Sequence, residues 1–179
     1  MYKRYEGDQI VLLDEDYNVI GLNDPKASKA TWAQLQVRSV QHTGTHFVYE
    51  LLRKFGWDAR CMHFTKENKE SGFIISPIRD PRKCYITWIS RKRKENFLEQ
   101  WKLFNEAYLT NKDLYVIPID TIDRDQRLEE LSNKLKCHLK TNWKPVGSRE
   151  HVEVDIDKDV LEEVYSLPVV RKFYAAIST

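Results

Sequence analysis

The sequence predicts an α/β fold with three layers, α/β/α, in which a central parallel sheet lies between two layers of helices and a β-hairpin precedes it. Strand-like and helix-like segments alternate from Leu35 onward, and short polar loops separate them. The segment 114–119 is an almost continuous apolar run, which is typical of a strand buried on both faces. The 179 residues contain no linker or repeat, so we expect one domain, with 1–32 as the appended hairpin and 33–179 as the α/β core with C-terminal helices.

The N-terminal hairpin is predicted from two short apolar runs on either side of a turn. Ile10–Leu13 and Val19–Leu22 flank Asp14–Asn18, which is rich in turn-forming residues. We expect the hairpin to pack on an edge of the main body, and a helical turn to follow it over Ala27–Trp32.

The core elements follow from apolar periodicity. Strands are predicted at 35–40, 57–64, 72–78 and 114–119. Helices are predicted at 47–55, which Gly56 should cap, and at 85–91, 96–109, 124–139 and 160–177. Pro168 should kink the last helix or start a new one, because proline lacks the amide hydrogen that an interior turn needs.

Composition excludes several classes of protein. The 29 Lys+Arg against 27 Asp+Glu give a net charge of +2, which disfavours a general nucleic-acid-binding function. No apolar run approaches the roughly 18 residues that span a bilayer, and Met1–Glu6 lacks the apolar core of a signal peptide, so we expect a cytoplasmic protein without a membrane partner. The three cysteines form no C-x-x-C pair, which argues against a disulfide framework or a zinc site.

The first candidate site is the loop Thr43-Gly44-Thr45 between a strand and a helix. Ligands of open α/β sheets bind at the carboxyl ends of the strands, and the backbone amides at a helix start attract anions. Gly44 permits close approach, and the hydroxyls of Thr43 and Thr45 are potential donors to phosphate oxygens. We therefore expect a phosphate-binding loop, with a tight turn capped by Thr45 as the alternative. It is not a Walker motif, because the second glycine and the lysine are missing.

The second candidate site is the segment Arg79–Thr87, which follows a predicted strand. Arg79 offers a planar fork to a phosphate, Pro81 suits the first turn of a helix, and Thr87 lies about two turns beyond Arg79. The alternative is that Arg79 and Asp80 only cap and pair locally. Downstream, the basic run 91–94 either steers an anionic nucleotide or a polyanionic acceptor to this face or is a solvated helix end.

Together the two segments resemble the motifs of the sulfotransferase family, a P-loop-related group that uses 3'-phosphoadenosine 5'-phosphosulfate. His42-Thr43-Gly44-Thr45-His46 resembles the family's K-[ST]-G-T-[TS] loop, and Arg79–Thr87 resembles its R-[ND]-P-x-D-x-x-x-S stretch, with Thr87 in place of the serine. The resemblance covers about residues 35–139. It departs at His42, where many members have a lysine, and at Lys83, where they have an acidic residue. The chain thus looks like a short and divergent member.

The resemblance implies which residues hold the sulfuryl donor. The loop residues that would hold its 5' end are Thr43, Gly44, Thr45 and His46. Arg79 and Thr87 would hold the 3'-phosphate. The segment 144–149, with Ser148 and Arg149, is the candidate for the loop that completes this phosphate site.

The resemblance also implies catalytic roles, with a hydroxyl or amine of unknown identity as the acceptor. His42 would assist the leaving group, and with an ordinary pKa of about 6.5 it would be partly charged at neutral pH. His63 or Glu67 would be the base, with His46 as a third candidate. No metal is expected, because no His/Asp/Glu set has ligand spacing. The alternatives are a nucleotide or nucleoside kinase and a degenerate nucleotide-binding or interaction module.

Overall fold

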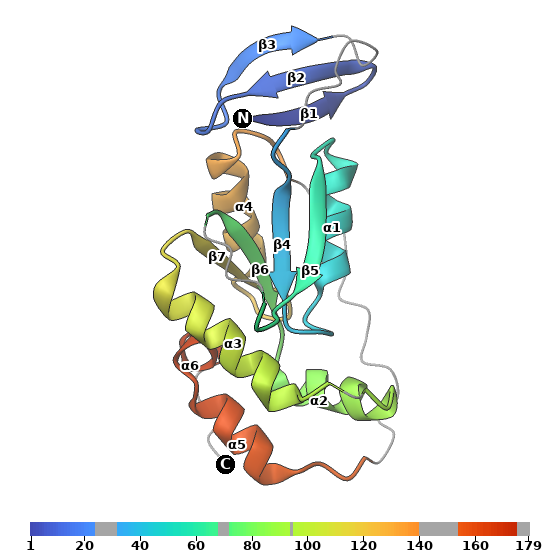
Figure 1. Cartoon of the computed structure of the whole chain (residues 1–179), viewed down its shortest axis with the longest axis vertical. Helices are drawn as coiled ribbons and strands as arrows, with labels where there is room; N and C mark the ends of the chain where they lie inside the picture. Colours follow the sequence, from blue (N-terminus) through green and yellow to red (C-terminus); the bar gives the residue numbers. More distant parts are fainter. Residues whose placement is uncertain (24–31, 68–71, 94, 140–153, 175–179) are drawn as a thin grey trace.

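The computed structural model describes residues 1–23, 32–67, 72–93, 95–139 and 154–174, and it has the predicted α/β architecture (Figure 1). Four parallel strands form the central sheet in the order β5-β4-β6-β7. Their bounds are Leu35–Ser39 (β4), Ala59–His63 (β5), Ile74–Ile78 (β6) and Leu114–Pro118 (β7). Every residue of β6 is buried, as expected for an inner strand that helices cover on both faces.

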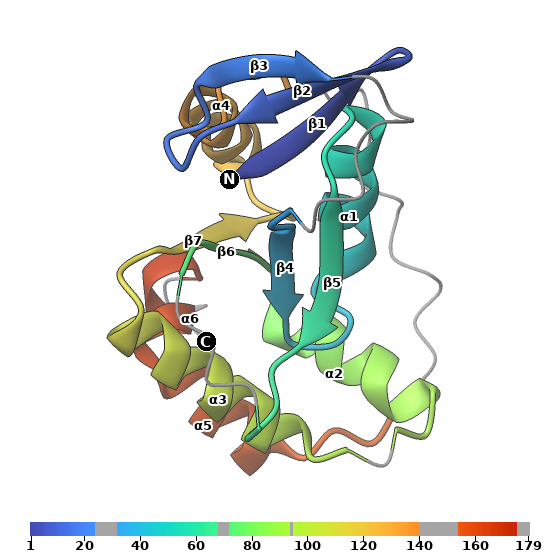
Figure 2. The same cartoon turned by 45° about the horizontal axis from the view of Figure 1, so that its top comes forward.

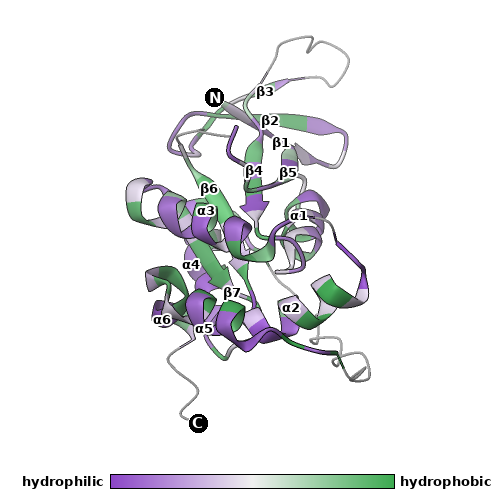
Figure 3. Cartoon of the chain, turned by 60° about the horizontal axis from the view of Figure 1, so that its bottom comes forward, coloured by the Kyte–Doolittle hydropathy of each residue, from purple (hydrophilic) through white to green (hydrophobic). Residues whose placement is uncertain are grey.

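Two separate apolar cores confirm the three layers. On one face, Val37 and Ile75 pack with the apolar residues of α1 (Thr45–Lys54) and α4 (Arg124–Lys134). On the other face, Val116 packs with the remaining helices, which are α2 (Pro81–Ser90), α3 (Phe97–Thr110), α5 (Lys158–Ser166) and α6 (Pro168–Phe173). Figure 2 shows α3, α5 and α6 grouped together, away from α1. In Figure 3, β6 and β7 are largely hydrophobic, as their place between the two layers requires.

The N-terminal element is larger than the predicted hairpin. Three antiparallel strands form a second sheet in the order β1-β2-β3, with bounds Tyr2–Glu6, Gln9–Leu13 and Val19–Asn23. The sequence pattern does not reveal β1, because Arg4 is its one fully buried residue. This sheet lies at the end where the parallel strands begin (Figure 1), and Leu13 and Tyr17 enter the core beneath α1 and α4. It therefore supports the core from the end opposite to the candidate site.

The start of α2 differs from the prediction for a local reason. The helix begins at Pro81, four residues earlier than expected, because the Asp80 carboxylate accepts a hydrogen bond from the Arg82 amide over 2.8 Å. An aspartate cap followed by proline in the first turn is a favourable helix start. α2 therefore begins directly after Arg79 and Asp80, which follow the end of β6.

The helices predicted at 124–139 and 160–177 are shorter than expected. α4 ends at Lys134, since Lys136 adopts φ 51°, a left-handed conformation that terminates helices. The last predicted helix is two helices, because Pro168 starts α6 as a new one. The turn predicted at 27–32 lies almost wholly outside the described residues. In the part of the chain that the structure describes, every helix is too short or too polar to cross a membrane.

Candidate active site at the carboxyl ends of the strands

The candidate site lies where the parallel strands end. β4 leads through residues 40–44 into α1, β5 ends at His63, Arg79 follows β6, and Asp120 lies just beyond β7. Parallel strands end at one edge of their sheet, so these four segments meet although they are far apart in sequence. In Figure 1 this edge faces α2 and lies opposite the β1–β3 sheet.

Gly44 is required at the loop-to-helix junction. It is the N-cap of α1 with φ 98°, a conformation that residues with a Cβ rarely adopt. A Cβ at this position would also overlap the side chain of Ile119, which follows β7. The loop therefore packs tightly against the neighbouring strand end.

The preceding residue His42 is held in an unusual conformation by the opposite helical layer. Its φ is 65°, which is uncommon for any residue with a side chain. The Cys84 thiol of α2 donates to the His42 carbonyl over 3.5 Å, and the Gln41 amide donates to Oε1 of Gln100 in α3 over 3.2 Å. These contacts give the loop a defined shape, as a preorganised binding site needs.

Backbone amides, rather than both threonine hydroxyls, are available to an anion. The first amides of a helix have no intrahelical acceptor, and Gly44 provides no side-chain cap. The hydroxyl of Thr43 differs from expectation, since it is fully buried and donates to the Val40 carbonyl over 2.6 Å. The hydroxyl of Thr45 shares a short hydrogen bond with Ser39 Oγ, so it can donate to a ligand only when Ser39 is the donor in that pair.

His42 is neutral at pH 7, unlike the partly charged residue expected from its ordinary pKa. Burial, followed by the charges of Arg91 and Arg93, lowers its pKa to about 4. The geometry agrees, because Arg93 Nε donates to His42 Nε2 over 3.4 Å and only a neutral imidazole has an acceptor nitrogen. The fixed positive charge beside the loop is therefore on Arg93.

His63 is held as a neutral imidazole with a defined tautomer. Its Nδ1 lies 3.3 Å from the Ser39 carbonyl oxygen, which can only accept, so Nδ1 carries the hydrogen. Burial lowers the pKa of His63, while the bond to Ser39 opposes that shift. The lone pair is then on Nε2, which is the arrangement a general base requires.

Arg79 is a partly buried cation without a bound counter-charge. Among the described residues, its guanidinium forms no ion pair and no hydrogen bond. Its charge is the smallest of the causes that lower the pKa of His42, after burial, Arg91, Arg93 and His63. Thr87 is not joined to it, because the Thr87 hydroxyl donates to the Lys83 carbonyl within α2 over 3.1 Å.

Two tyrosines from the C-terminal helices brace the same edge. Tyr165 donates a hydrogen bond to the Asp80 carboxylate, and Tyr174 donates one to the Asp120 carboxylate. Lys83, at the position where the resembling family has an acid, has its Nζ 3.2 Å from Asp120 Oδ2. These contacts fix the start of α2 against the end of β7.

The remaining predicted residues are less closely joined to the loop. His46 is exposed in the first turn of α1, near enough for its charge to act on His63. Glu67 is exposed beyond β5, and no hydrogen bond or ion pair joins it to the described residues of the loop. Ser148 and Arg149 lie outside the described residues.

Two charged residues of the site were not assigned from the sequence. Arg93 and Glu95, in the turn between α2 and α3, act on His63, with Arg93 lowering its pKa and Glu95 raising it against the larger effect of burial. The signal for Arg93 was the basic run 91–94, which is equally typical of a solvated helix end. Among the described residues, no group of three or more His, Cys, Asp or Glu side chains could hold a metal ion.

The fold and the site define a parallel α/β protein with a strand–loop–helix turn and two neutral histidines at one edge. No protein-family model matches the sequence, and no curated protein matches it significantly. Among solved structures, the chain is similar to a mouse sulfotransferase, SULT7A1, in complex with PAP, with a TM-score of 0.42 and 12% identity. The match covers 80% of this chain and 64% of the mouse chain, a little under two thirds of that protein. At this degree of similarity, a function has to be argued from the chain's own residues.

Proposed function

We propose that the protein transfers a sulfuryl group from 3'-phosphoadenosine 5'-phosphosulfate to a hydroxyl or amine acceptor. The observation that carries this proposal is the Arg79 guanidinium, which has no ion pair or hydrogen bond among the described residues and lies at the same sheet edge as the loop 40–44 and the neutral His63. The loop has no lysine, the arginine fork is separate from it, and a base is positioned nearby. This combination suits the phosphosulfate donor better than a magnesium nucleotide. The motif resemblance of the two segments points the same way.

The donor fits the residues present. Its 5' end would lie against the first amides of α1, which follow Gly44. Arg79, eight residues before Thr87, would take the 3'-phosphate, and Thr87 would join it once its hydroxyl rotates away from Lys83. The bound donor supplies an activated sulfuryl group linked to its 5'-phosphate.

The transfer step needs a base, a leaving group and a nearby cation. The acceptor oxygen or nitrogen attacks sulfur and forms the new bond to it, while its proton passes to Nε2 of His63. The bond between sulfur and the bridging phosphate oxygen breaks, and its electron pair leaves with 3',5'-adenosine bisphosphate. Arg93 supplies the charge that stabilises this leaving group, and His42 orients Arg93 by accepting its Nε hydrogen. His42 therefore acts as a positioning residue in place of the loop lysine.

The assay that tests the proposal measures acceptor-dependent release of 3',5'-adenosine bisphosphate from the phosphosulfate donor, across a panel of hydroxyl and amine acceptors. A parallel reaction with magnesium ATP measures acceptor-dependent ADP. We expect bisphosphate release and no ADP. ADP formation alone would assign a kinase instead, and bisphosphate binding without any turnover would assign a nucleotide-binding module.

A further inference from the structure

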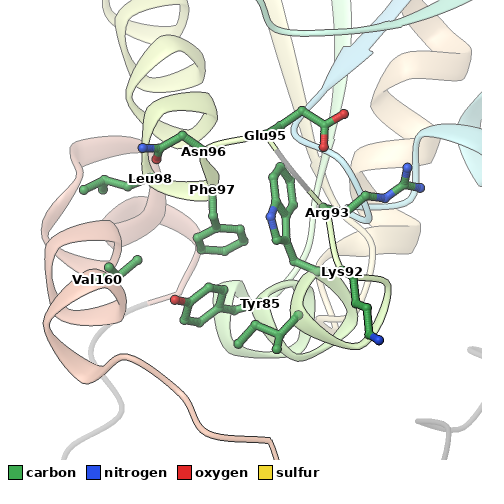
Figure 4. A pocket seen from close by; sticks show the side chains of 10 residues that line it. Tyr85, Lys92, Arg93, Glu95, Asn96, Phe97, Leu98 and Val160 are labelled. Atoms are coloured by element: carbon green, nitrogen blue, oxygen red, sulfur yellow. The ribbon is translucent and has the colours of Figure 1, made fainter.

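A pocket of about 420 Å³ opens between the end of α2, the start of α3 and the start of α5 (Figure 4). This volume is in the range of small-molecule sites, about 300–1,000 Å³. Its lining comes from residues 85–98, at the end of α2 and the start of α3, and from Val160 in α5. Gly44, Arg79 and Thr87, which are proposed to bind the phosphates of the donor, do not line the pocket, whereas Arg93 does.

One side of the pocket is an aromatic wall. The rings of Tyr85 and Phe97 stack with centroids 4.5 Å apart, and Trp88 meets Phe97 edge-on at 5.3 Å. In Figure 4, Leu98 and Val160 extend this apolar lining away from the charged side chains. A wall of this kind favours a flat apolar body, which gains both burial and ring contacts.

The opposite end is charged and adjoins the reaction site. Arg93 lines the pocket and also donates to His42, while Trp88 lies edge-on to the His42 ring with centroids 6.1 Å apart. Glu95 lines the same end and acts electrostatically on His63. A molecule lying on the aromatic wall would thus have its polar end beside Arg93 and Trp88, the two lining residues that contact His42.

Lys92 makes the outer rim positive. Its side chain lines the pocket and extends away from Arg93 in Figure 4. Among the described residues, its ammonium forms no ion pair and no hydrogen bond. Because Arg93 is directed at the loop, Lys92 is the cation that remains for a ligand, and charge complementarity then favours an anionic group.

We propose that this pocket is the acceptor site and that the acceptor is a planar aromatic acid, with its ring on the Tyr85–Phe97–Trp88 wall and its anionic group at Lys92. The assignment of the bound molecule as an acceptor rests on the proposed sulfuryl transfer. Recognition of an aromatic acid by the pocket is independent of that proposed transfer, because it depends only on the aromatic wall and on Lys92.

The test compares a hydroxyaryl acid with its neutral counterpart, 3-(4-hydroxyphenyl)propanoate against the corresponding amide. Each is titrated calorimetrically into the protein, with and without saturating 3',5'-adenosine bisphosphate. We expect the acid to bind about tenfold more tightly than the amide. This preference should fall below about threefold in Lys92→Met and persist in Lys112→Met, which removes an exposed lysine from the turn before β7.

The second part of the experiment uses variants in which a larger side chain fills the pocket. Val160→Trp and Leu98→Trp, on different helices, should each abolish binding of the acid while leaving bisphosphate affinity and the thermal unfolding midpoint unchanged. The proposal is overturned if acid and amide bind equally, if Lys92→Met keeps the preference, or if both folded tryptophan variants still bind the acid. Failure of the bisphosphate to bind while the acid binds would contradict the transfer function and leave the pocket assignment standing.

Discussion

The Arg93 guanidinium donates to Nε2 of His42 across 3.4 Å, although the two residues lie 51 positions apart. This contact makes the histidine an acceptor and places the permanent charge on the arginine. A loop that lacks the lysine of the resembling motif thus still has a cation beside it, supplied by the turn after α2. In the proposed reaction, that cation faces the departing phosphate.

Replacing Arg93 by methionine should raise the pKa of His42 from about 4, since a nearby positive charge is removed. The pKa should remain below about 6.5, because burial, the largest cause of the shift, persists. Proton NMR titration of the His42 ring measures this value. Arg82→Met, at an exposed arginine near the start of α2, should leave it unchanged, and an unshifted His42 in Arg93→Met would contradict the contact.

Acidification should destabilise the fold through His42. The unfolded residue takes up a proton below about pH 6.5, whereas the folded residue does so only near pH 4. The unfolded state therefore binds more protons between these values, so the free energy of unfolding falls as the pH falls from 6.5 to 4. Urea unfolding at pH 7, 5.5 and 4.5 should show a smaller decline in His42→Gln than in the wild type. The control is His138→Gln at an exposed histidine, which should show the same decline as the wild type. If the free energy of unfolding declines equally in His42→Gln and in the wild type, His42 does not have this role.

Substitution of Gly44 by alanine should destabilise the protein by roughly 2–4 kcal/mol, because backbone strain at φ 98° adds to overlap with Ile119. Gly7→Ala is the matched control. Gly7 also has positive φ, 61°, but a Cβ there would meet nothing within 4 Å, so about 1 kcal/mol is expected. Denaturant unfolding measures both values, and equal losses would show that the packing against Ile119 is unimportant.

His63→Gln should lower the rate of sulfuryl transfer about 100-fold or more, since the amide cannot take the acceptor's proton. Bisphosphate affinity should change less than about threefold, because His63 lies at the end of β5 and not in the loop. Single-turnover kinetics and calorimetry separate the two effects. Glu67→Gln distinguishes the other candidate base, and a larger loss of rate in that variant would transfer the role from His63 to Glu67.

The sequence was sufficient for the architecture and for the sheet edge at which the candidate residues meet. Alternating apolar segments predict a parallel sheet, and strand–loop–helix order alone puts Gly44 and Arg79 at the same edge. The N-terminal sheet was underestimated because β1 pairs through its backbone while most of its side chains are polar. Strand pairing of that kind leaves little periodic signal.

The internal arrangement of the site was not predictable, since it depends on contacts between distant segments. The Thr43 hydroxyl, expected to donate to phosphate, donates to the Val40 carbonyl because the loop folds back on itself. The neutral state of His42 follows from burial and from arginines that the turn after α2 brings to it. Likewise, Tyr174 follows α6, which packs against α3 and α5, and its hydroxyl meets Asp120 from 54 positions away. The spacing of residues in a single sequence does not predict these contacts.

The most direct test of the proposed site compares the affinities of 3',5'-adenosine bisphosphate and of 5'-AMP, which lacks the 3'-phosphate, in the wild type, Arg79→Ala and Arg82→Ala. If the Arg79 guanidinium holds the 3'-phosphate, the bisphosphate should bind at least about tenfold more tightly than AMP in the wild type and in Arg82→Ala. This difference in affinity should be lost in Arg79→Ala. Equal affinities for the two nucleotides in the wild type, or an undiminished preference in Arg79→Ala, would contradict the assignment.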